Sequence, residues 1–528
     1  MIRAPLLLRP LRALGLAGAL GLLVGAGPAH AGARDDLEAL LGATPAWSQG
    51  AAGPPPDGRW WAGLGDPTLT AAIDRALSEN NDLLASFARV DQARARQRTA
   101  LSAVLPQLSF DAQATAAPRE SLGFQFGLNQ QSNAAAQAAQ ELVVDTDGDG
   151  VPDAPDPAAV AAAEAAAKEA EEEASTLFWN GSAKFNATWN LDLWGRNLQS
   201  FQASRMDEAA ARGDRDAAAI ALVTAVAAAW SDLVTAEARR ALLARQVEIN
   251  RQMLELVQLR FTSAQSSGLD VLQQQQQLAS AEALVPAVEQ GVERAIVRMA
   301  TLLGQDPVAL RSSLRPAAAL PALPAQPALG APKDLLRNRP DLAAALAQAE
   351  AAEHRAKGAT RALLPTVGLN ANAGWQGNDI SEEWQSQQVW GFGGSVSVPL
   401  FTGLRTLGGL QDAKAGQVAA SFTLRQRALA AVAEVEDALL AEQQAAAELA
   451  ALRRLTEAAR LAFEDSRDRY GRGLVNYTTV LQALTVYQSA ELQALNAHRN
   501  LIGARINLHD ALGGAWPQAL RAAPEDLR

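Results

Sequence analysis

The stretch Ser182–Leu191, which reads SAKFNATWNL, alternates apolar and polar residues from end to end. Successive side chains of a β-strand point to opposite faces, so this pattern predicts a strand with one apolar face and one polar face. Three more segments alternate in the same way: Gln107–Ala116, Thr366–Gln376 and Val389–Leu400. Strands of about ten residues with this pattern are typical of proteins that cross an outer membrane, with lipid on one side and water on the other.

A half-buried sheet of a soluble protein would alternate in the same way. Three features favour the membrane: an export signal, tryptophans near the strand ends, and the lack of another segment able to cover the apolar faces. Four strands cannot close a barrel, because small barrels need about eight. Open sheet edges are not tolerated in lipid. The sequence therefore predicts that several copies of the chain share one barrel.

The chain also contains an internal repeat. Motifs recur in the same order in its two halves, and the first half carries an insertion between its two strands. The matched pairs are Arg260-Phe261 with Arg469-Tyr470, Val271-Leu272-Gln273 with Val480-Leu481-Gln482, Leu303-Gly304 with Leu512-Gly513, and Leu105-Pro106 with Leu364-Pro365. Each half is predicted to contain a helix, a strand pair and two further helices.

Long helices are predicted for the rest of the chain. Arg196 to about Phe261 contains no proline, and neither does Leu404 to about Tyr470. At 1.5 Å per residue each helix would be about 100 Å long. Apolar residues recur at spacings of seven, or of three and four, among many alanines, which suits close packing in an antiparallel coiled-coil array. Helices of this length suggest a tube that crosses the periplasm.

The N-terminus predicts export. Arg3, Arg9 and Arg12 precede the apolar run Ala13–Gly27, and Ala29-His30-Ala31 offers the small-residue cleavage site of a signal peptide. No later segment is expected to reach the roughly 20 apolar residues of a membrane helix. The chain has no cysteine, which excludes disulfides and a lipid-modified N-terminal cysteine. Its net charge is −11, and the sequence has no basic cluster of the kind that binds nucleic acid.

These observations divide the chain into consecutive segments. They are a signal peptide (1–31), an N-terminal segment with the first long helix (32–105), a first strand pair (106–192) with an inserted extracellular loop (118–176), the first-repeat helices (193–315), a linker (316–332), a second-repeat helix (333–364), a second strand pair (365–401), second-repeat helices (402–516) and a tail (517–528).

Several motifs, taken in order, resemble the TolC-like outer membrane factor family, the outer-membrane channels of tripartite efflux pumps. The motifs are Trp60-Trp61 with Leu64-Gly65-Asp66-Pro67, Asn80-Asn81-Asp82-Leu83, Trp189 to Arg196 (WNLDLWGR), Arg339-Pro340-Asp341, Val398-Pro399-Leu400-Phe401, Arg469-Tyr470 with Gly473, and Ala511 to Trp516. The Trp-Trp opening is most similar to the branch that serves resistance-nodulation-division pumps.

The resemblance implies a mostly α-helical fold with a small β part. Three chains would complete a twelve-stranded barrel, continued by a long antiparallel coiled-coil tunnel with a gate at its periplasmic end. It implies a homotrimer in outer-membrane lipid, a periplasmic membrane-fusion adaptor and an inner-membrane pump as partners, and passive export of small molecules. Type I protein secretion is an alternative role for the same channel, and a soluble periplasmic coiled-coil scaffold is a further alternative.

The resemblance also assigns roles at the helix-to-helix turns. It implies a gate made of Thr478, Thr479, Gln482, Arg469 and Tyr470, and adaptor contacts at Arg260, Phe261, Ser267, Gly473 and Asn476. Relatives often carry an aspartate where this chain has Gln482, and a ring of glutamines lacks the charge that would concentrate cations. These residues could equally be ordinary packing residues of a helix turn.

The insertion contains an acidic segment that matches a calcium-binding loop. The candidate ligands are Asp145, Asp147, Asp149, Asp153 and Asp156. Calcium prefers six or more oxygen ligands, which alternating carboxylates can supply around a sharp glycine turn. A merely solvated acidic loop is the alternative, with Asp156 capping a following helix.

No catalytic constellation is apparent, so no enzyme activity and no required cofactor are expected. His354, His498 and His509 lie on separate predicted helices without ligand-like spacing. The sequence contains no phosphate-binding loop and no serine nucleophile elbow. Energy for transport would have to come from a partner.

Overall fold

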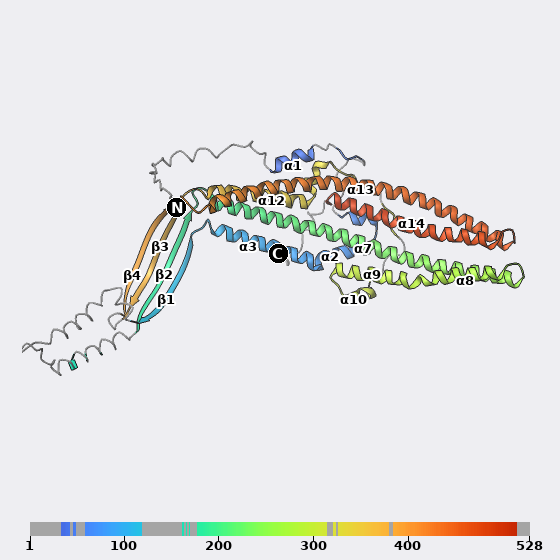
Figure 1. Ribbon diagram of the computed structural model, residues 1–528, viewed down its shortest axis with the longest axis horizontal. Coiled ribbons are helices and arrows are strands. Elements are labelled where there is room, and N and C mark those ends of the chain that lie inside the picture. Colours follow the sequence, from blue (N-terminus) through green and yellow to red (C-terminus); the bar gives the residue numbers. More distant parts are fainter. Residues whose placement is uncertain are drawn as a thin grey trace, which may run out of the picture. The chain divides into compact units, whose positions relative to one another are not determined.

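The computed structural model describes residues 33–42, 46–48, 59–118, 161–162, 165, 168, 177–313, 320–323, 326–379 and 384–514. These residues are mostly helical and include one antiparallel sheet (Figure 1). The chain divides into two compact units. The sheet unit comprises Gln92–Arg205 and Ala351–Gln417, and the helical unit comprises Met1–Asp91, Met206–Glu350 and Val418–Arg528.

The sheet contains four strands in the order of the sequence. They are β1 (Gln107–Pro118), β2 (Leu177–Leu191), β3 (Thr366–Asn378) and β4 (Gln385–Ser397), and each pairs with its neighbour in antiparallel fashion. Within the described residues, β1 and β4 each pair with one strand only, so both edges of the sheet are open.

The register places the apolar residues of all four strands on one face. Phe110 lies opposite Phe185, which lies opposite Ala373, which in turn lies opposite Trp390. The rings of Phe110 and Phe185 are 5.0 Å apart. This apolar face is uncovered: Phe392 is 83% exposed and Trp390 is 75% exposed.

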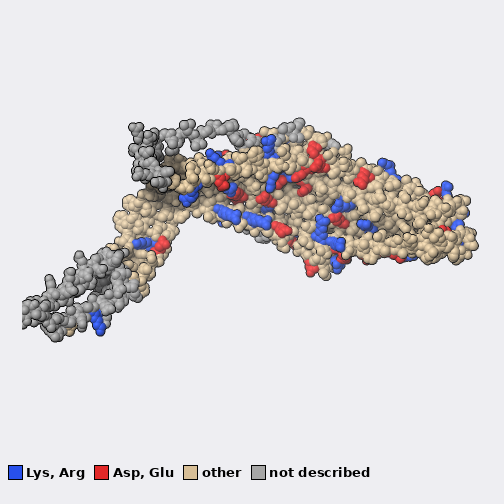
Figure 2. All heavy atoms as spheres, in the orientation of Figure 1, with Lys and Arg blue, Asp and Glu red and all other residues tan. Residues whose placement is uncertain are grey.

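The opposite face of the sheet is polar. Asp111 lies opposite Lys184, and Asn186 lies opposite Asn372. Lys184 Nζ donates to Gln376 Oε1 at 3.0 Å, and Asn186 Nδ2 donates to Asp111 Oδ2 at 2.6 Å. On the face of the molecule that Figure 2 shows, the strands carry few charged side chains compared with the helical part. The period-two alternation in the sequence therefore predicted the two faces of the sheet correctly.

The last strand is shorter than expected. The prediction that it continues to Leu400 was wrong, because β4 ends at Ser397. Pro399 follows two residues later and has no N–H to donate to a neighbouring strand. Val398, Leu400 and Phe401 are exposed in a connection that leads into the next helix.

Two helices of 67 residues follow the two strand pairs, α7 (Arg196–Thr262) and α13 (Arg405–Gly471). Each half also has a 22-residue helix before its strands, α3 (Asn81–Ser102) and α12 (Pro340–Arg361). The returning helix of the second half, α14 (Tyr477–Ala511), is continuous. Its counterpart is broken into α8 (Gly268–Ala283) and α9 (Val285–Leu303), because Pro286 cannot continue a helix interior.

Shorter helices complete the described part of the chain. They are α1 (Ala33–Gly42), the 3-10 helix η1 (Trp60–Leu64), α2 (Pro67–Glu79), α10 (Pro307–Ser313), the 3-10 helix η2 (Pro332–Asp334) and α11 (Leu335–Asn338).

Family-like motifs occupy structural positions where the chain turns. Asp66 caps α2 by accepting from Thr68 N at 2.9 Å, and its second oxygen accepts from Trp230 Nε1 at 2.8 Å. Asp192 caps α7 in the same manner, accepting from Leu198 N at 2.7 Å. Gly195, just before α7, has a φ of 72°, a conformation that favours glycine.

The described residues of the helical unit form three apolar cores. The largest joins η1, α2, α7 and α9 around Trp61, Val226 and Met299. A second joins α1, α12 and α13, and a third lies among α7, α8, α13 and α14 near the helix turns.

One expectation about α7 was wrong. From the sequence, no segment after the signal peptide was expected to be apolar enough for a membrane helix. However, an 18-residue window of α7 has a mean hydropathy of 1.8 and could span a membrane by its length and composition. In the structure, 56% of that window is buried. Its apolar character is explained by packing, because Val223, Val226 and Leu233 lie in the largest core.

Candidate functional site

Two turns connect the long helices to the helices that return, and both have the same backbone. The first turn (263–267) joins α7 to α8, and the second turn (472–476) joins α13 to α14. Ala264 and Gly473 hold equivalent left-handed positions, with φ values of 57° and 79°. Gln265 N donates to Arg260 O at 2.8 Å, and Leu474 N donates to Arg469 O at 2.9 Å. This six-to-one bond closes a helix end in the Schellman arrangement.

Two buried tyrosines form the centre of the site. Tyr470 lies in the last turn of α13 and Tyr477 begins α14. Each is 2% exposed, and their rings meet edge to face at 6.0 Å between centres. They pack with Met253, Val257 and Phe463 in the third core. Burial raises the pKa of both phenols above the ordinary value, so both stay neutral at physiological pH.

Arg260 connects the two turns. It comes from the end of α7, and its guanidinium lies 4.6 Å from the centre of the Tyr470 ring. Its Nη1 donates to the carbonyl oxygen of Tyr470, and its Nη2 donates to Gln265 O at 3.4 Å. The side chain therefore gives a second donor to the carbonyl oxygen of Tyr470, which also accepts from Gly473 N at 2.9 Å.

A chain of buried polar groups continues from the tyrosines into the helix core. Tyr477 Oη donates to Gln274 Oε1 at 2.6 Å, and Gln274 Nε2 donates to Asn250 O at 2.8 Å. Asn250 Nδ2 donates to Gln246 O at 2.8 Å. Gln274 and Asn250 are both fully buried, so these bonds fix the register of α7, α8 and α14.

The expected gate residues fall into two groups. Tyr470 is buried, whereas Thr478, Thr479 and Gln482 are exposed on one face of α14. Arg469 is exposed and pairs with Asp465 of its own helix at 2.8 Å. The structure thus places Arg260, rather than Arg469, between the turns.

The expected adaptor contacts also have local structural roles. Ser267 forms a capping box with Asp270, in which Asp270 N donates to Ser267 Oγ at 3.2 Å and Ser267 N donates to Asp270 Oδ2 at 3.0 Å. Asn476 caps α14 by accepting from Thr479 N at 3.2 Å. Phe261 is 49% exposed and Gly473 supplies the left-handed turn position.

An uncharged polar stripe runs along the exposed face of α14. Its members recur at spacings of three and four, which places them on one side of a helix. They are Thr478, Thr479, Gln482, Thr485, Ser489, Gln493, Asn496 and Asn500. The stripe therefore exposes hydroxyl and amide groups, which carry no charge, to water and to solutes.

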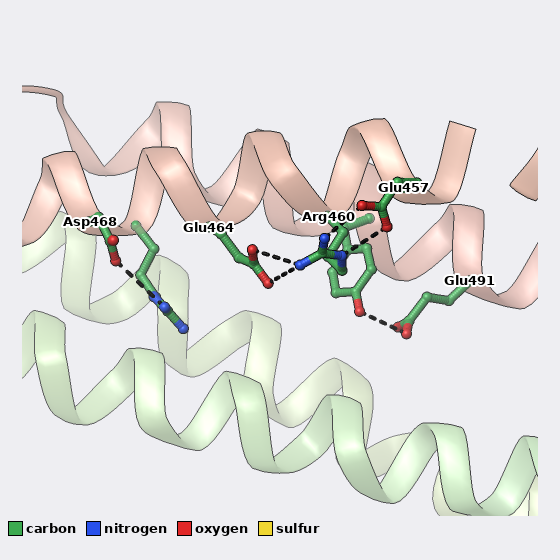
Figure 3. Close-up of polar contacts among 7 residues, drawn as sticks. Glu457, Arg460, Glu464, Asp468 and Glu491 are labelled. Carbon is green, nitrogen blue, oxygen red and sulfur yellow. Dashed lines mark hydrogen bonds and ion pairs between the residues drawn. The ribbon is translucent and has the colours of Figure 1, made fainter. Parts of the chain in front are cut away.

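On α13, charged side chains pair with one another along the helix that leads to the second turn. Arg460 pairs with Glu457 at 2.6 Å and with Glu464 at 2.7 Å, both on the same helix (Figure 3). Figure 3 also shows Asp468 further along α13, and Glu491 on α14 bonded to a phenol. That phenol is Tyr487, whose Oη donates to Glu491 Oε1 at 2.9 Å, and burial raises its pKa to about 12.

Sequence reasoning missed the partners of the tyrosines. Gln274 lies in the run Gln273–Gln277, where alternation gives no sign of which glutamine is buried. Asn250 and Gln246 are spaced four apart, a helical spacing that could have indicated a shared face.

No group of three or more His, Asp or Glu residues in the described ranges could hold a metal ion. The predicted calcium ligands Asp145, Asp147, Asp149, Asp153 and Asp156 lie outside the described residues.

Comparison with known proteins identifies the fold and the family. The family model described as outer membrane efflux protein matches residues 162–305 and 331–514. The pyoverdine export outer membrane protein OpmQ of Pseudomonas putida is 28% identical over 463 residues, which are 87% of this chain and 89% of OpmQ. The solvent efflux pump outer membrane protein SrpC of the same species is 29% identical over 336 residues, 62% of this chain and 70% of SrpC.

Solved structures agree in fold. The outer-membrane channel OprN matches with a TM-score of 0.72 at 24% identity, covering 89% of this chain and 98% of OprN. VceC of Vibrio cholerae matches with a TM-score of 0.71 at 23% identity, covering 87% of this chain and all of VceC. The resemblance expected from the sequence motifs is confirmed. The chain belongs to the outer membrane efflux protein family, whose members are channels of the outer membrane that extend into the periplasm.

Proposed function

We propose that three copies of this chain form the outer-membrane duct of a tripartite efflux pump and export small molecules passively. The observation that carries the proposal is the sheet, which has one exposed apolar face, one polar face and two open edges. In lipid, an open edge would leave backbone N–H and C=O groups without partners. Joining β4 of one copy to β1 of the next removes every edge and turns the apolar faces outward.

Three copies suit a duct better than two. Two copies would give eight strands, and the interior of an eight-stranded barrel is filled by side chains or holds one small ligand. Three copies would give twelve strands and leave a wider interior, lined by the polar face that carries Lys184, Asn186 and Asn372. The membership in an efflux-channel family supports this arrangement.

The long helices would continue this barrel into the periplasm and narrow at the turns. In this proposal the uncharged stripe of α14 lines the narrow end, with Thr478, Thr479 and Gln482 as the constriction. Arg260 and the two buried tyrosines would hold the turns together behind it. A constriction of hydroxyl and amide groups would restrict passage by size rather than by charge.

The tip of the first turn is the proposed contact for a periplasmic adaptor. Leu259, Phe261, Leu269 and Leu272, on either side of this turn, are each about half exposed or more. Exposed apolar side chains of this kind are available for contact with another protein. Ser267, Gly473 and Asn476 lie in the same two turns. Relatives named as outer membrane proteins of efflux pumps support an inner-membrane pump as the energy source, and the Trp60-Trp61 opening favours a resistance-nodulation-division pump.

The test combines native mass with conductance in a planar lipid bilayer. A purified trimer with a small, steady conductance supports the proposal, because the turns restrict the duct. Replacing Tyr470 by Ala should raise that conductance, while Phe261→Ala serves as the matched control at the equivalent exposed position. A monomer without conductance would refute the duct. A trimer whose conductance is unchanged by Tyr470→Ala would refute a gate at the second turn.

A further inference from the structure

The sheet unit contains a pocket of about 690 Å³ where the strands meet the long helices. It is lined by the first turns of α7 and α13, the last turns of α12, and the adjoining ends of β3 and β4. Arg196, Arg355 and Arg405 contribute to its wall, together with His354. No Asp or Glu is among its lining residues. Three arginines from three helices thus converge on one hollow.

Arg196 and Arg405 have no carboxylate partner in the described part of the chain. Asp412, the acidic residue nearest in sequence to Arg405, does not line the pocket, and two other nearby acidic groups are committed elsewhere. Asp192 accepts from the backbone of Asn197 and Leu198, and Glu353 pairs with Lys357 at 2.6 Å. Arg196 and Arg405 therefore give the pocket a positive charge, although the whole chain carries −11.

The register of the sheet determines which side the pocket faces. Thr366 and Ser397 line the pocket and are paired across β3 and β4. Counting along the strands in steps of two, both lie on the same face as Asn370 and Gly393, which is the polar face. The pocket therefore opens on the side of the sheet that faces water and not on the apolar side.

We propose that this pocket binds the carboxylate or phosphate groups of solutes that pass through the duct, and that it makes the duct prefer anions. The inference rests on the proposed function, because the polar face lines the interior only when the barrel closes. Guanidinium groups bind carboxylate and phosphate with two parallel hydrogen bonds. With three copies around one axis, the arginines form a positive ring where the barrel joins the helices. A charged ring of this kind selects ions by sign.

The ring would also complement the uncharged constriction. The stripe on α14 offers only hydroxyl and amide groups, so it cannot select a solute by its charge. The pocket supplies that selection at a different level of the duct. The substrate class implied is therefore small molecules that carry an acidic group.

The first test is the ratio of chloride to potassium permeability, taken from the reversal potential in a potassium chloride gradient. The wild-type duct should favour chloride. The double variant Arg196→Gln with Arg405→Gln should lower the ratio by roughly twofold or more, since a focused positive potential raises the local anion concentration by about tenfold or more. The effect should weaken as salt rises, because the Debye length falls from about 30 Å at 0.01 M to about 10 Å at 0.1 M.

Two further variants separate charge from structure. Arg196→Lys with Arg405→Lys keeps both charges and should retain the preference for chloride. Arg311→Gln removes a surface arginine that pairs with Glu293 in the helical unit, and it should leave the permeability ratio unchanged. Pyrophosphate is the binding probe: it should reduce the wild-type current and have little effect on the double glutamine variant. Native mass confirms that each variant assembles.

The outcomes distinguish the two proposals. If the wild-type protein carries no current, the duct itself is refuted. If current flows and the glutamine pair leaves both the permeability ratio and the pyrophosphate block unchanged, the anion site is refuted and the duct stands. A lysine pair that behaves like the glutamine pair also refutes the site, because the effect would then not depend on charge.

Discussion

The two helix turns share a backbone but use it differently. Both place a left-handed residue at the same position, and both close the helix end with the same six-to-one hydrogen bond. In the second turn the aromatic residue, Tyr470, is buried under Arg260. In the first turn the equivalent residue, Phe261, is half exposed beside exposed leucines. Duplication preserved the shape of the turn, and substitution changed its surface.

The difference lies in which side chains are available to each turn. Tyr477 at the start of α14 gives Tyr470 an aromatic partner, whereas its equivalent in the first turn is Gly268. The two equivalent arginines also diverge: Arg260 reaches the other turn and Arg469 pairs within its own helix. We interpret the second turn as the anchored partner and the first turn as the surface available for another protein.

The largest expected effect comes from truncating the equivalent aromatics. Tyr470→Ala should destabilise the turns by about 3–5 kcal/mol, because it leaves a cavity in a packed core. Phe261→Ala should cost about 1 kcal/mol or less, because its side chain is half exposed. Amide hydrogen exchange across residues 249–260 and 463–484 measures both changes. Equal loss of protection in the two variants would abolish the distinction between an anchored and an exposed turn.

The next effect separates the two arginines. Arg260→Ala should weaken protection of the same amides by about 2 kcal/mol, since it removes a charged hydrogen bond to a helix-end carbonyl. Arg469→Ala should change it by about 0.5 kcal/mol, as expected for an exposed ion pair. The single-channel conductance of both variants gives a second measurement. If Arg469→Ala has the larger effect on either measurement, the assignment of the bridging arginine is wrong.

Much of the fold could be predicted from local sequence patterns. Period-two alternation predicted the strands and both faces of the sheet, because each strand's pattern is set by what its two sides contact. The absence of proline predicted the first and last residues of α7 and α13 to within about two positions. The end of β4 could not be predicted from alternation, since Val398 and Leu400 continue the pattern after hydrogen bonding has stopped.

The site was less predictable because its contacts join residues far apart in the sequence. The repeat indicated that Arg260 and Arg469 are equivalent, but equivalence does not tell which one crosses between the turns. The burial of Gln274 depends on Tyr477, a residue of the other repeat. The arginine pocket is formed by Arg196, Arg355 and Arg405, which no motif connects. Tertiary packing, rather than local pattern, determines these contacts.

Alkaline pH should open the second turn before the first. Burial raises the pKa values of Tyr470 and Tyr477 in the folded protein above the ordinary value near 10. At a pH between the unfolded and the folded pKa values, the folded state therefore binds more protons than the unfolded state. Stability from these groups is therefore complete below about pH 10 and falls as pH rises, by about 1 kcal/mol at about pH 10.5. Hydrogen exchange followed against pH, corrected for the intrinsic rate, measures this loss. Tyr470→Phe with Tyr477→Phe should remove the dependence, and a dependence that persists would assign it to other groups.

The smallest expected effect tests the shared backbone itself. Ala264 and Gly473 occupy the same left-handed position, which costs a residue with a Cβ about 1 kcal/mol relative to glycine. Ala264→Gly should therefore stabilise the first turn by up to about 1 kcal/mol. The gain is reduced by the higher conformational entropy that glycine gives the unfolded chain. Gly473→Ala should destabilise the second turn by a similar amount. The cause is backbone strain and not a steric clash, because an added Cβ would lie 3.6 Å from Arg260 Nη2, an ordinary van der Waals distance. Hydrogen exchange at the two turns should show changes of opposite sign. Changes of the same sign would mean that side-chain packing, and not the common backbone, controls the stability of one of the turns.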